Sequence, residues 1–127
     1  MTDAARTDDA PSPAERYAAQ RELRSLAEAA RQARNGDTVE VDTGDYRRDV
    51  AVWTQDSLTL RAVGGRVRLI ASGGAAEAKA IWVVRGGRIA AEGFDFEGTR
   101  VPSRNGAGIR FEAGRLTLRD CRFTGNE

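Results

Sequence analysis

The stretch Arg115–Asn126, RLTLRDCRFTGN, decides the fold, because the earlier stretch Arg88–Thr99, RIAAEGFDFEGT, repeats its pattern. Their first residues are numbered 88 and 115, which gives an offset of 27 residues. The two copies align apolar residues with apolar residues, phenylalanine with phenylalanine, and glycine with glycine. A repeat at such a period is typical of solenoids, in which each coil buries its apolar residues against the next coil. The stretch therefore predicts stacked coils.

The same pattern extends towards the N-terminus as short apolar–polar alternations between glycine turns. The segments GDTVEV (36–41), SLTLRAV (57–63) and AIWVV (80–84) show it, and it is the pattern of β-strands. The predicted inward columns of stacked side chains are Val50/Ile81/Ile109, Val52/Val83/Phe111, Val39/Leu58/Ile89/Leu116, Val41/Leu60/Ala91/Leu118, Val63/Phe94/Cys121 and Phe96/Phe123. Equivalent residues recur after a whole coil and not across a short hairpin, which favours a parallel solenoid over an antiparallel sandwich. We therefore predict an all-β, parallel β-helix of about three coils across residues 37–127.

The N-terminal part of the chain predicts a tail followed by a capping helix. Residues 1–11 are polar and carry no periodic pattern, so we expect a disordered tail. The next segment is rich in helix-forming residues, and Ser12-Pro13 at its start and Asn35-Gly36 at its end are typical helix boundaries. Its apolar stripe is narrow, so we expect a helix over residues 12–36 that caps one end of the core.

The composition argues against several functions. The 20 basic and 19 acidic residues nearly balance, so there is no basic excess for nucleic acid or an anionic membrane. Histidine is absent, which removes the commonest general base and metal ligand. The single cysteine, Cys121, cannot form an internal disulfide or a thiolate cluster, and we expect it to be a buried, inert thiol. We expect no metal, no cofactor and no nucleic-acid partner.

The sequence shows no targeting segment and no membrane-spanning segment. It contains no run of about 18 apolar residues, so we expect no membrane insertion. The N-terminus lacks the basic region and apolar segment of a signal peptide. As written, the sequence predicts a cytoplasmic chain.

Four stretches carry a resemblance to a known family: GDTVEVDTGDY (36–46), SLTLRAVGG (57–65), NGAGIRF (105–111) and RLTLRDCRFTGNE (115–127). They resemble the N-terminal part of right-handed parallel β-helix proteins of the pectate-lyase-like superfamily. The resemblance covers most of the chain, from Ser25 onwards. It implies a right-handed parallel β-helix in which an N-terminal helix caps the open end of the solenoid.

The resemblance also implies a connection with carbohydrates. The superfamily includes polysaccharide lyases, glycoside hydrolases, uronan epimerases, tailspikes and adhesins, and the catalytic residues of its enzymes lie on middle coils. None of their catalytic motifs is matched here, so we assign no catalytic residue, and the sequence stops in a turn at Glu127. We expect the N-terminal scaffold part of a carbohydrate-active protein whose working coils lie further on. The alternative is a non-catalytic β-helix, namely an adhesive or assembly scaffold or a remnant.

Outward positions of the predicted coils carry charges of alternating sign. Arg61, Glu92 and Arg119 form one outward column, and Asp95 and Arg122 form another. Opposite charges on neighbouring strands attract each other, so a solvated, salt-bridged face is the simplest interpretation. The functional alternative is a surface that binds acidic sugars.

Alternation also turns Trp82 outward, in register with Ala51 and Arg110. An exposed tryptophan can stack on a sugar ring, although cover by a loop, residues 72–79 or 98–105, is the more common arrangement. The candidate carbohydrate contacts are Trp82, Arg110, Arg119 and Arg122, and the expected partner is a polysaccharide.

The last predicted coil has no further coil above it. Its inward residues Leu116, Leu118, Cys121 and Phe123 are therefore expected to be uncovered. Bare strand edges pair readily with other chains. We expect self-association, end to end, through this open C-terminal coil.

Overall fold

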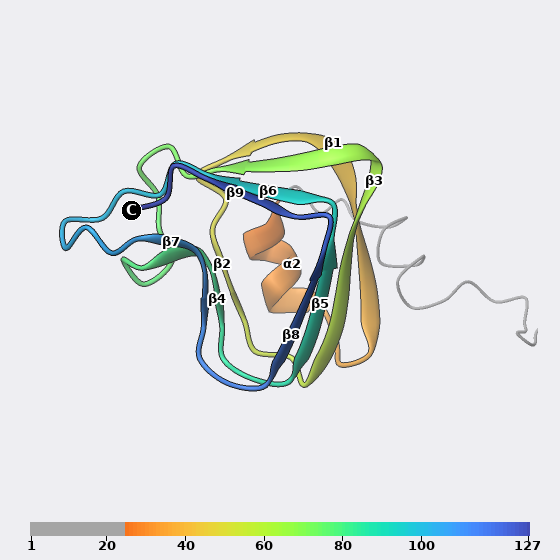
Figure 1. The fold of residues 1–127 in the computed structure, drawn as a ribbon. Coiled ribbons are helices and arrows are strands. Elements are labelled where there is room, and N and C mark those ends of the chain that lie inside the picture. The colour runs from red at the N-terminus through yellow and green to blue at the C-terminus, as the bar shows by residue number, and fades with distance from the viewer. Residues whose placement is uncertain (1–24) are drawn as a thin grey trace, which may run out of the picture.

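The computed structural model describes residues 25–127, whose strands form a parallel β-solenoid of about three turns (Figure 1). The elements are α2 (Leu26–Gln32), β1 (Asp37–Arg47), β2 (Ala51–Trp53), β3 (Ser57–Ile70), β4 (Ala80–Val84), β5 (Arg88–Glu92), β6 (Phe94–Glu97), β7 (Ala107–Phe111), β8 (Arg115–Arg119) and β9 (Arg122–Thr124). The predicted mostly-β fold, with stacked parallel strands and a short helix near the N-terminus, is confirmed. Within this described part, no helix is long and apolar enough to cross a membrane.

Three walls surround the core, because β1 and β3 each bend around a corner. The first halves of these strands lie in the wall of β5 and β8, and their second halves lie in the wall of β6 and β9. The third wall is the separate sheet β2-β4-β7. In Figure 1 the three walls enclose a common interior, and two loops project from the corner between β6 and β7.

The helix α2 closes one end of the stack. It lies within the outline of the coils in Figure 1, and its buried residues Leu26, Ala29 and Ala30 belong to the core cluster. The side chain of Gln55 donates through Nε2 to the carbonyl oxygens of Ala30 and Ala33, at 3.0 Å each. These carbonyls lie near the end of the helix, where intrahelical donors run out, so Gln55 holds α2 on the first coil.

The sequence predicted one helix over residues 12–36, but no helix runs continuously through Ser25. Ser25 has an extended backbone (φ −154°, ψ 156°), and its Oγ accepts from the Glu28 amide at 3.0 Å. A residue with this geometry is an N-cap, so α2 begins after it. The helix ends at Gln32, and Gly36, with a φ of +88°, belongs to the turn before β1. The start of the predicted helix lies outside the described residues.

The strand register confirms several predicted columns and corrects others. The confirmed columns are Leu58/Ile89/Leu116, Leu60/Ala91/Leu118 and Phe96/Phe123. On β1 the prediction is wrong by two residues, because Val39 lies beside Leu60 and Val41 lies beside Ala62. A shift of two keeps every side chain on the same face of the sheet, so alternation alone cannot detect it.

The predicted column through Val63 is wrong, because the corner of β3 contains extra residues. Val63 has an exposed fraction of 39%, and Phe94 lies beside Val67 instead. Residues 62–66 turn this corner, whereas the next coil turns it with Gly93 alone. Coils of different length therefore share the same walls.

On the third wall the predicted register of β2 with β4 is confirmed, since Val52 lies beside Val83, but β7 is offset by one residue from the prediction. Trp82 lies beside Ile109 and Val83 lies beside Arg110, whereas the sequence alignment had paired Ile109 with Ile81. Every residue of β4 is buried. Because AIWVV is apolar on both faces of the strand, alternation could not show which face turns inward.

Trp82 points into the core, so its predicted outward orientation is wrong. Its exposed fraction is 0%. Its ring centroid lies 5.3 Å from that of Trp53, 5.2 Å from that of Phe94 and 4.9 Å from that of Phe96. These four rings form an aromatic cluster that joins the third wall to the wall of β6.

Candidate functional site

Two columns of alternating charge run along the outside of the stack and form the candidate site. In chain order they are Glu40–Arg61–Glu92–Arg119 and Asp45–Arg68–Asp95–Arg122. Neighbouring members lie in register on adjacent parallel strands, which are separated by about 4.8 Å. The predicted neighbours Arg61, Glu92 and Arg119 are confirmed, as is the pair of Asp95 and Arg122. The sequence prediction missed the acidic member that β1 adds to each column.

The first column contains one close ion pair near its base. Arg61 Nη2 lies 2.6 Å from Glu40 Oε2, and both side chains are substantially exposed. Exposed pairs of this kind contribute little to stability, because solvent and salt screen them. Glu92 and Arg119 follow on the next two coils and are exposed as well.

The second column is more strongly connected. Arg68 lies 3.0 Å from Asp45 Oδ2 and 3.0 Å from Glu97 Oε1. The hydrogen bonds with Glu97, together with the nearby charge of Asp45, hold the pKa of Arg68 above its ordinary value. Asp95 has an exposed fraction of only 6%, so its carboxylate needs a partner inside the wall.

That partner is Arg66, which comes from the extra residues at the corner of β3. Its Nε donates to Asp95 Oδ1 at 2.8 Å, and its Nη2 donates to the carbonyl oxygen of Asp120 at 2.8 Å. Its Nη1 lies 3.1 Å from Asp120 Oδ2. The hydrogen bond with Asp95 is the main reason that the pKa of Arg66 is raised. Arg66 thus joins its own coil to the next two coils.

The structure separates the four predicted carbohydrate contacts. Arg119 and Arg122 are exposed and lie on the same last coil, on either side of a corner. Arg110 lies on the third wall, with its Nε 3.1 Å from Glu112 Oε2. Trp82 lies inside the core and offers no surface to a ligand. Only Arg119 and Arg122 therefore share one part of the surface.

A further ion-pair cluster lies on the third wall and was missed from the sequence. Arg85 Nη1 donates to both carboxylate oxygens of Glu112 at 2.9 Å, and Arg85 also pairs with Glu77. The hydrogen bond from Arg85, followed by that from Arg110, lowers the pKa of Glu112. Arg85 and Glu112 are 27 residues apart in the sequence, and the pairing of β4 with β7 brings them together.

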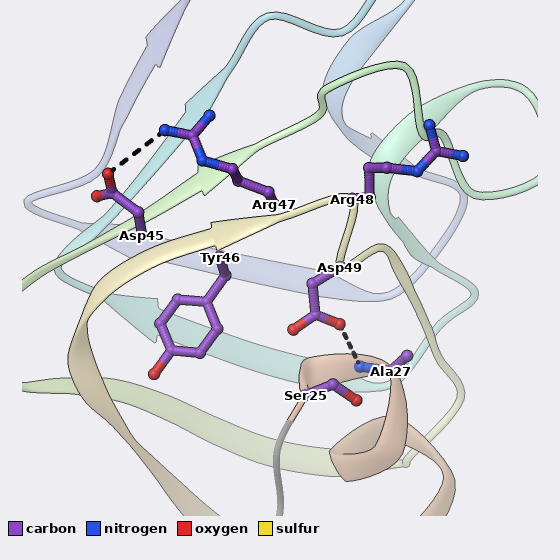
Figure 2. A pocket seen from close by; sticks show the side chains of 7 residues that line it. All are labelled: Ser25, Ala27, Asp45, Tyr46, Arg47, Arg48 and Asp49. Carbon is purple, nitrogen blue, oxygen red and sulfur yellow. Dashed lines mark hydrogen bonds and ion pairs between the residues drawn. The ribbon is translucent and has the colours of Figure 1, made fainter.

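A hollow of about 570 Å³ lies between the end of β1 and the start of α2 (Figure 2). Its polar lining serves the fold. The carboxylate of Asp49 accepts from the amides of Leu26 at 2.6 Å and Ala27 at 3.0 Å, which satisfies the first turn of the helix. The hydroxyl of Tyr46 donates to the carbonyl oxygen of Asp42 at 2.6 Å.

Tyr46 makes the stability of the fold depend on pH in the alkaline range. Burial, followed by the charges of Asp42 and Asp49, raises its pKa above 10.0. A raised pKa means that its contribution to stability is complete below the unfolded-state pKa and is lost as pH rises through the folded-state value. We expect the free energy of unfolding to fall more steeply above about pH 10 in the parent chain than in Tyr46→Phe, which cannot ionise.

Urea unfolding at a series of pH values measures this difference. Tyr17→Phe is the matched control, since it removes the other tyrosine and leaves Tyr46 in place. Identical pH profiles for the parent chain and Tyr46→Phe would contradict the prediction.

In comparisons with known proteins, no family model, no curated protein and no solved structure matches the chain. Within residues 25–127, no group of three or more His, Cys, Asp or Glu side chains is arranged to hold a metal ion. The fold defines the class of the chain as a parallel β-solenoid of about three turns. The narrower resemblance to the pectate-lyase-like superfamily stays a prediction.

Proposed function

We propose that the chain is a scaffold, namely a stack of β coils that carries further β structure on its last coil. We call β7, β8 and β9 the end rung. The observation that supports the proposal is the exposure of its inward-register residues: Phe111, Leu118 and Phe123 have exposed fractions of 44%, 38% and 46%. The equivalent residues one coil below are Val84, Ala91 and Phe96, which are all at most 2% exposed. A further layer on the end rung would bury these side chains in the same way.

We place this scaffold in a carbohydrate-active protein of the pectate-lyase-like type, with catalysis performed elsewhere. The resemblance of the repeats supports this part of the proposal. Arg119 and Arg122 also support it, because exposed guanidinium groups on one coil suit the carboxylates of an acidic polysaccharide. A purely structural scaffold, adhesive or for assembly, uses the same end rung and is the second candidate.

The scaffold proposal is tested by adding one coil. Glu97 lies beside Thr124, so a second copy of residues 101–127 placed after Glu127 continues the stack in register. In this copy, threonine replaces the arginines that repeat Arg119 and Arg122, so that no charge is added above the columns. We expect the midpoint of thermal unfolding to rise by about 5 °C or more, because neighbouring coils stabilise each other.

The matched control carries the same added segment with serine at the positions that copy Ile109, Leu116 and Leu118. It has the same length but buries less apolar surface on the end rung. An equal midpoint for the two extended chains, measured by circular dichroism, would contradict the scaffold proposal.

A further inference from the structure

The chain contains three asparagines, Asn35, Asn105 and Asn126, and all of them lie in the described part of the chain. Glycine follows Asn35 and Asn105. An asparagine before glycine is prone to lose its side-chain amide, because a residue without a Cβ leaves its own nitrogen open to attack the asparagine Cγ. Both asparagines are exposed, so neither the dipeptide nor its exposure distinguishes them. Their hydrogen bonds do.

The pair Asn35-Gly36 is held in place by the following coil. Oδ1 of Asn35 accepts from the amide of Asp56 at 2.7 Å, and its Nδ2 donates to Asp56 Oδ2 at 3.4 Å. The amide of Gly36, which would have to attack, donates to the carbonyl oxygen of Ser57 at 2.7 Å. Attack therefore requires that these hydrogen bonds open first, which makes it slow in the folded chain.

Asn126 is held in a similar way. Its Oδ1 accepts from the amide of Thr99 at 3.0 Å, and its Nδ2 donates to the carbonyl oxygen of Phe96 at 3.0 Å. Both ends of the side-chain amide are therefore engaged, and the next residue is Glu127, which carries a side chain. Asn126 is thus protected by its bonds and by its neighbour.

The pair Asn105-Gly106 is open by comparison. It lies in the loop of residues 98–106, between β6 and β7, which projects from the stack (Figure 1). The hydroxyl of Ser103 donates to Oδ1 of Asn105. Within the described residues, neither Nδ2 of Asn105 nor the amide of Gly106 has a hydrogen-bond partner. The attacking nitrogen and the leaving group are therefore free, and the donor on Oδ1 favours attack at Cγ.

The exposure of this loop position does not depend on its place in the last coil. Ala80 lies beside Ala107, so Ala78 takes the position equivalent to Asn105 one coil below. Ala78 is exposed although a further coil lies above it. The walls of the stack are covered by the next coil, whereas this part of the projecting loop stays in contact with solvent.

We propose that Asn105 is a site of spontaneous deamidation in the folded chain, at which Asn35 and Asn126 stay intact. The nitrogen of Gly106 gives its proton to a solvent base and forms a bond with Cγ of Asn105. The bond from Cγ to Nδ2 then breaks, and ammonia leaves. Water opens the resulting cyclic imide: cleavage between Cγ and the glycine nitrogen gives aspartate, and cleavage of the original peptide bond gives isoaspartate. This chemistry is independent of the scaffold function.

Both products place a new negative charge in a basic loop. Residues 98–106 contain Arg100 and Arg104 and no acidic residue. The new carboxylate directly follows Arg104, so the positive charge of this surface falls by one unit. The change needs no enzyme and accumulates with the age of the chain.

Peptide mapping of the full chain tests the proposal, because arginine precedes both Asn35 and Asn105. Trypsin places them in separate peptides, residues 35–47 and 105–110. The folded chain is incubated at mildly alkaline pH, and mass spectrometry measures the conversion of amide to acid in each peptide over time. A sample that is digested without incubation corrects for conversion during digestion. We expect Asn105 to be converted at least about tenfold faster than Asn35.

The same incubation in guanidinium chloride isolates the contribution of the fold. Without structure both asparagines are simply followed by glycine, so we expect their rates to lie within about threefold of each other. Asn105→Gln is the matched variant, since its longer side chain forms the cyclic imide much more slowly. It should abolish conversion in peptide 105–110 and leave the rate at Asn35 unchanged. Gly106→Ala is unsuitable, because a Cβ there would lie 2.9 Å from Thr99 Cγ2.

Three results would overturn the proposal. The first is equal conversion of Asn35 and Asn105 in the folded chain. The second is an intact Asn105 in the folded chain over a period in which the denatured chain is converted, since the loop would then protect it. The third is an unchanged difference between the two sites in guanidinium chloride, which would assign that difference to the neighbouring sequence and not to the hydrogen bonds.

Discussion

Replacing Trp82 with alanine is expected to lower the free energy of unfolding by about 3–5 kcal/mol, measured by urea unfolding. The side chain is fully buried and contacts the rings of Trp53, Phe94 and Phe96. Removing it leaves a cavity between two walls, and the loss includes both the transfer free energy and the cavity term. A tryptophan on the outer surface would behave differently, since surface substitutions usually change stability by about 0.5 kcal/mol or less.

The control for this prediction is Trp82→Phe. Within the described part of the chain, the indole Nε1 of Trp82 is buried and has no hydrogen-bond partner. Phenylalanine retains most of the aromatic contact and removes the unpaired donor, so we expect a loss of about 1–2 kcal/mol. Equal losses for the two variants, or a negligible loss for Trp82→Ala, would contradict the buried position.

Gly87→Ala is expected to cost more than about 3 kcal/mol, because backbone conformation and close packing both require glycine at this corner. Gly87 has a φ of +80°. A Cβ at this position would lie 2.7 Å from the carbonyl oxygen of Asp56 and would also meet that of Gln55. The Asp56 oxygen accepts the amide of Arg88 at 2.8 Å, so it cannot move away without loss of that bond between coils.

Gly98→Ala separates the two causes. Gly98 has a similar φ of +77°, but nothing lies within 4 Å of the position that a Cβ would take. We expect this control to cost about 1–2 kcal/mol, which is the price of a left-handed backbone alone. Thermal or urea unfolding of both variants gives the difference, and equal losses would show that the neighbouring coil adjusts freely at Gly87.

The stacked architecture could be predicted from the sequence because the spacing between repeats is counted directly along the chain. The predicted pairing of Ile89 with Leu116 and of Ala91 with Leu118 was correct, since no insertion separates β5 from β8 and the offset stays at 27 residues, from 88 to 115. The predictions failed where coil length or burial changed locally. Residues 62–66 widen one corner, so the register of β3 with β6 could not be obtained from alternation. Because β4 is buried on both faces, alternation could not give the register of β4 with β7 either.

The candidate site was predicted only in part, for a related reason. Glu92 and Arg119 repeat at the coil period, so their stacking follows directly from the alignment. Arg66 belongs to the extra corner residues and has no equivalent in the next coil. Its hydrogen bonds to Asp95 and Asp120 depend on how the corner folds in space. The spacing of residues along the sequence carries no information about that conformation. The glycine pair before Arg66 was the one available signal of an irregular corner.

Arg66 also changes how cooperatively the stack should unfold. Stacked repeats commonly behave as a linear array in which each unit is coupled only to its neighbours. The guanidinium of Arg66 bonds to the next coil through Asp95 and to the one after it through Asp120. It therefore couples units that are not adjacent, so that loss of the outermost coil weakens the restraint on a coil two layers below.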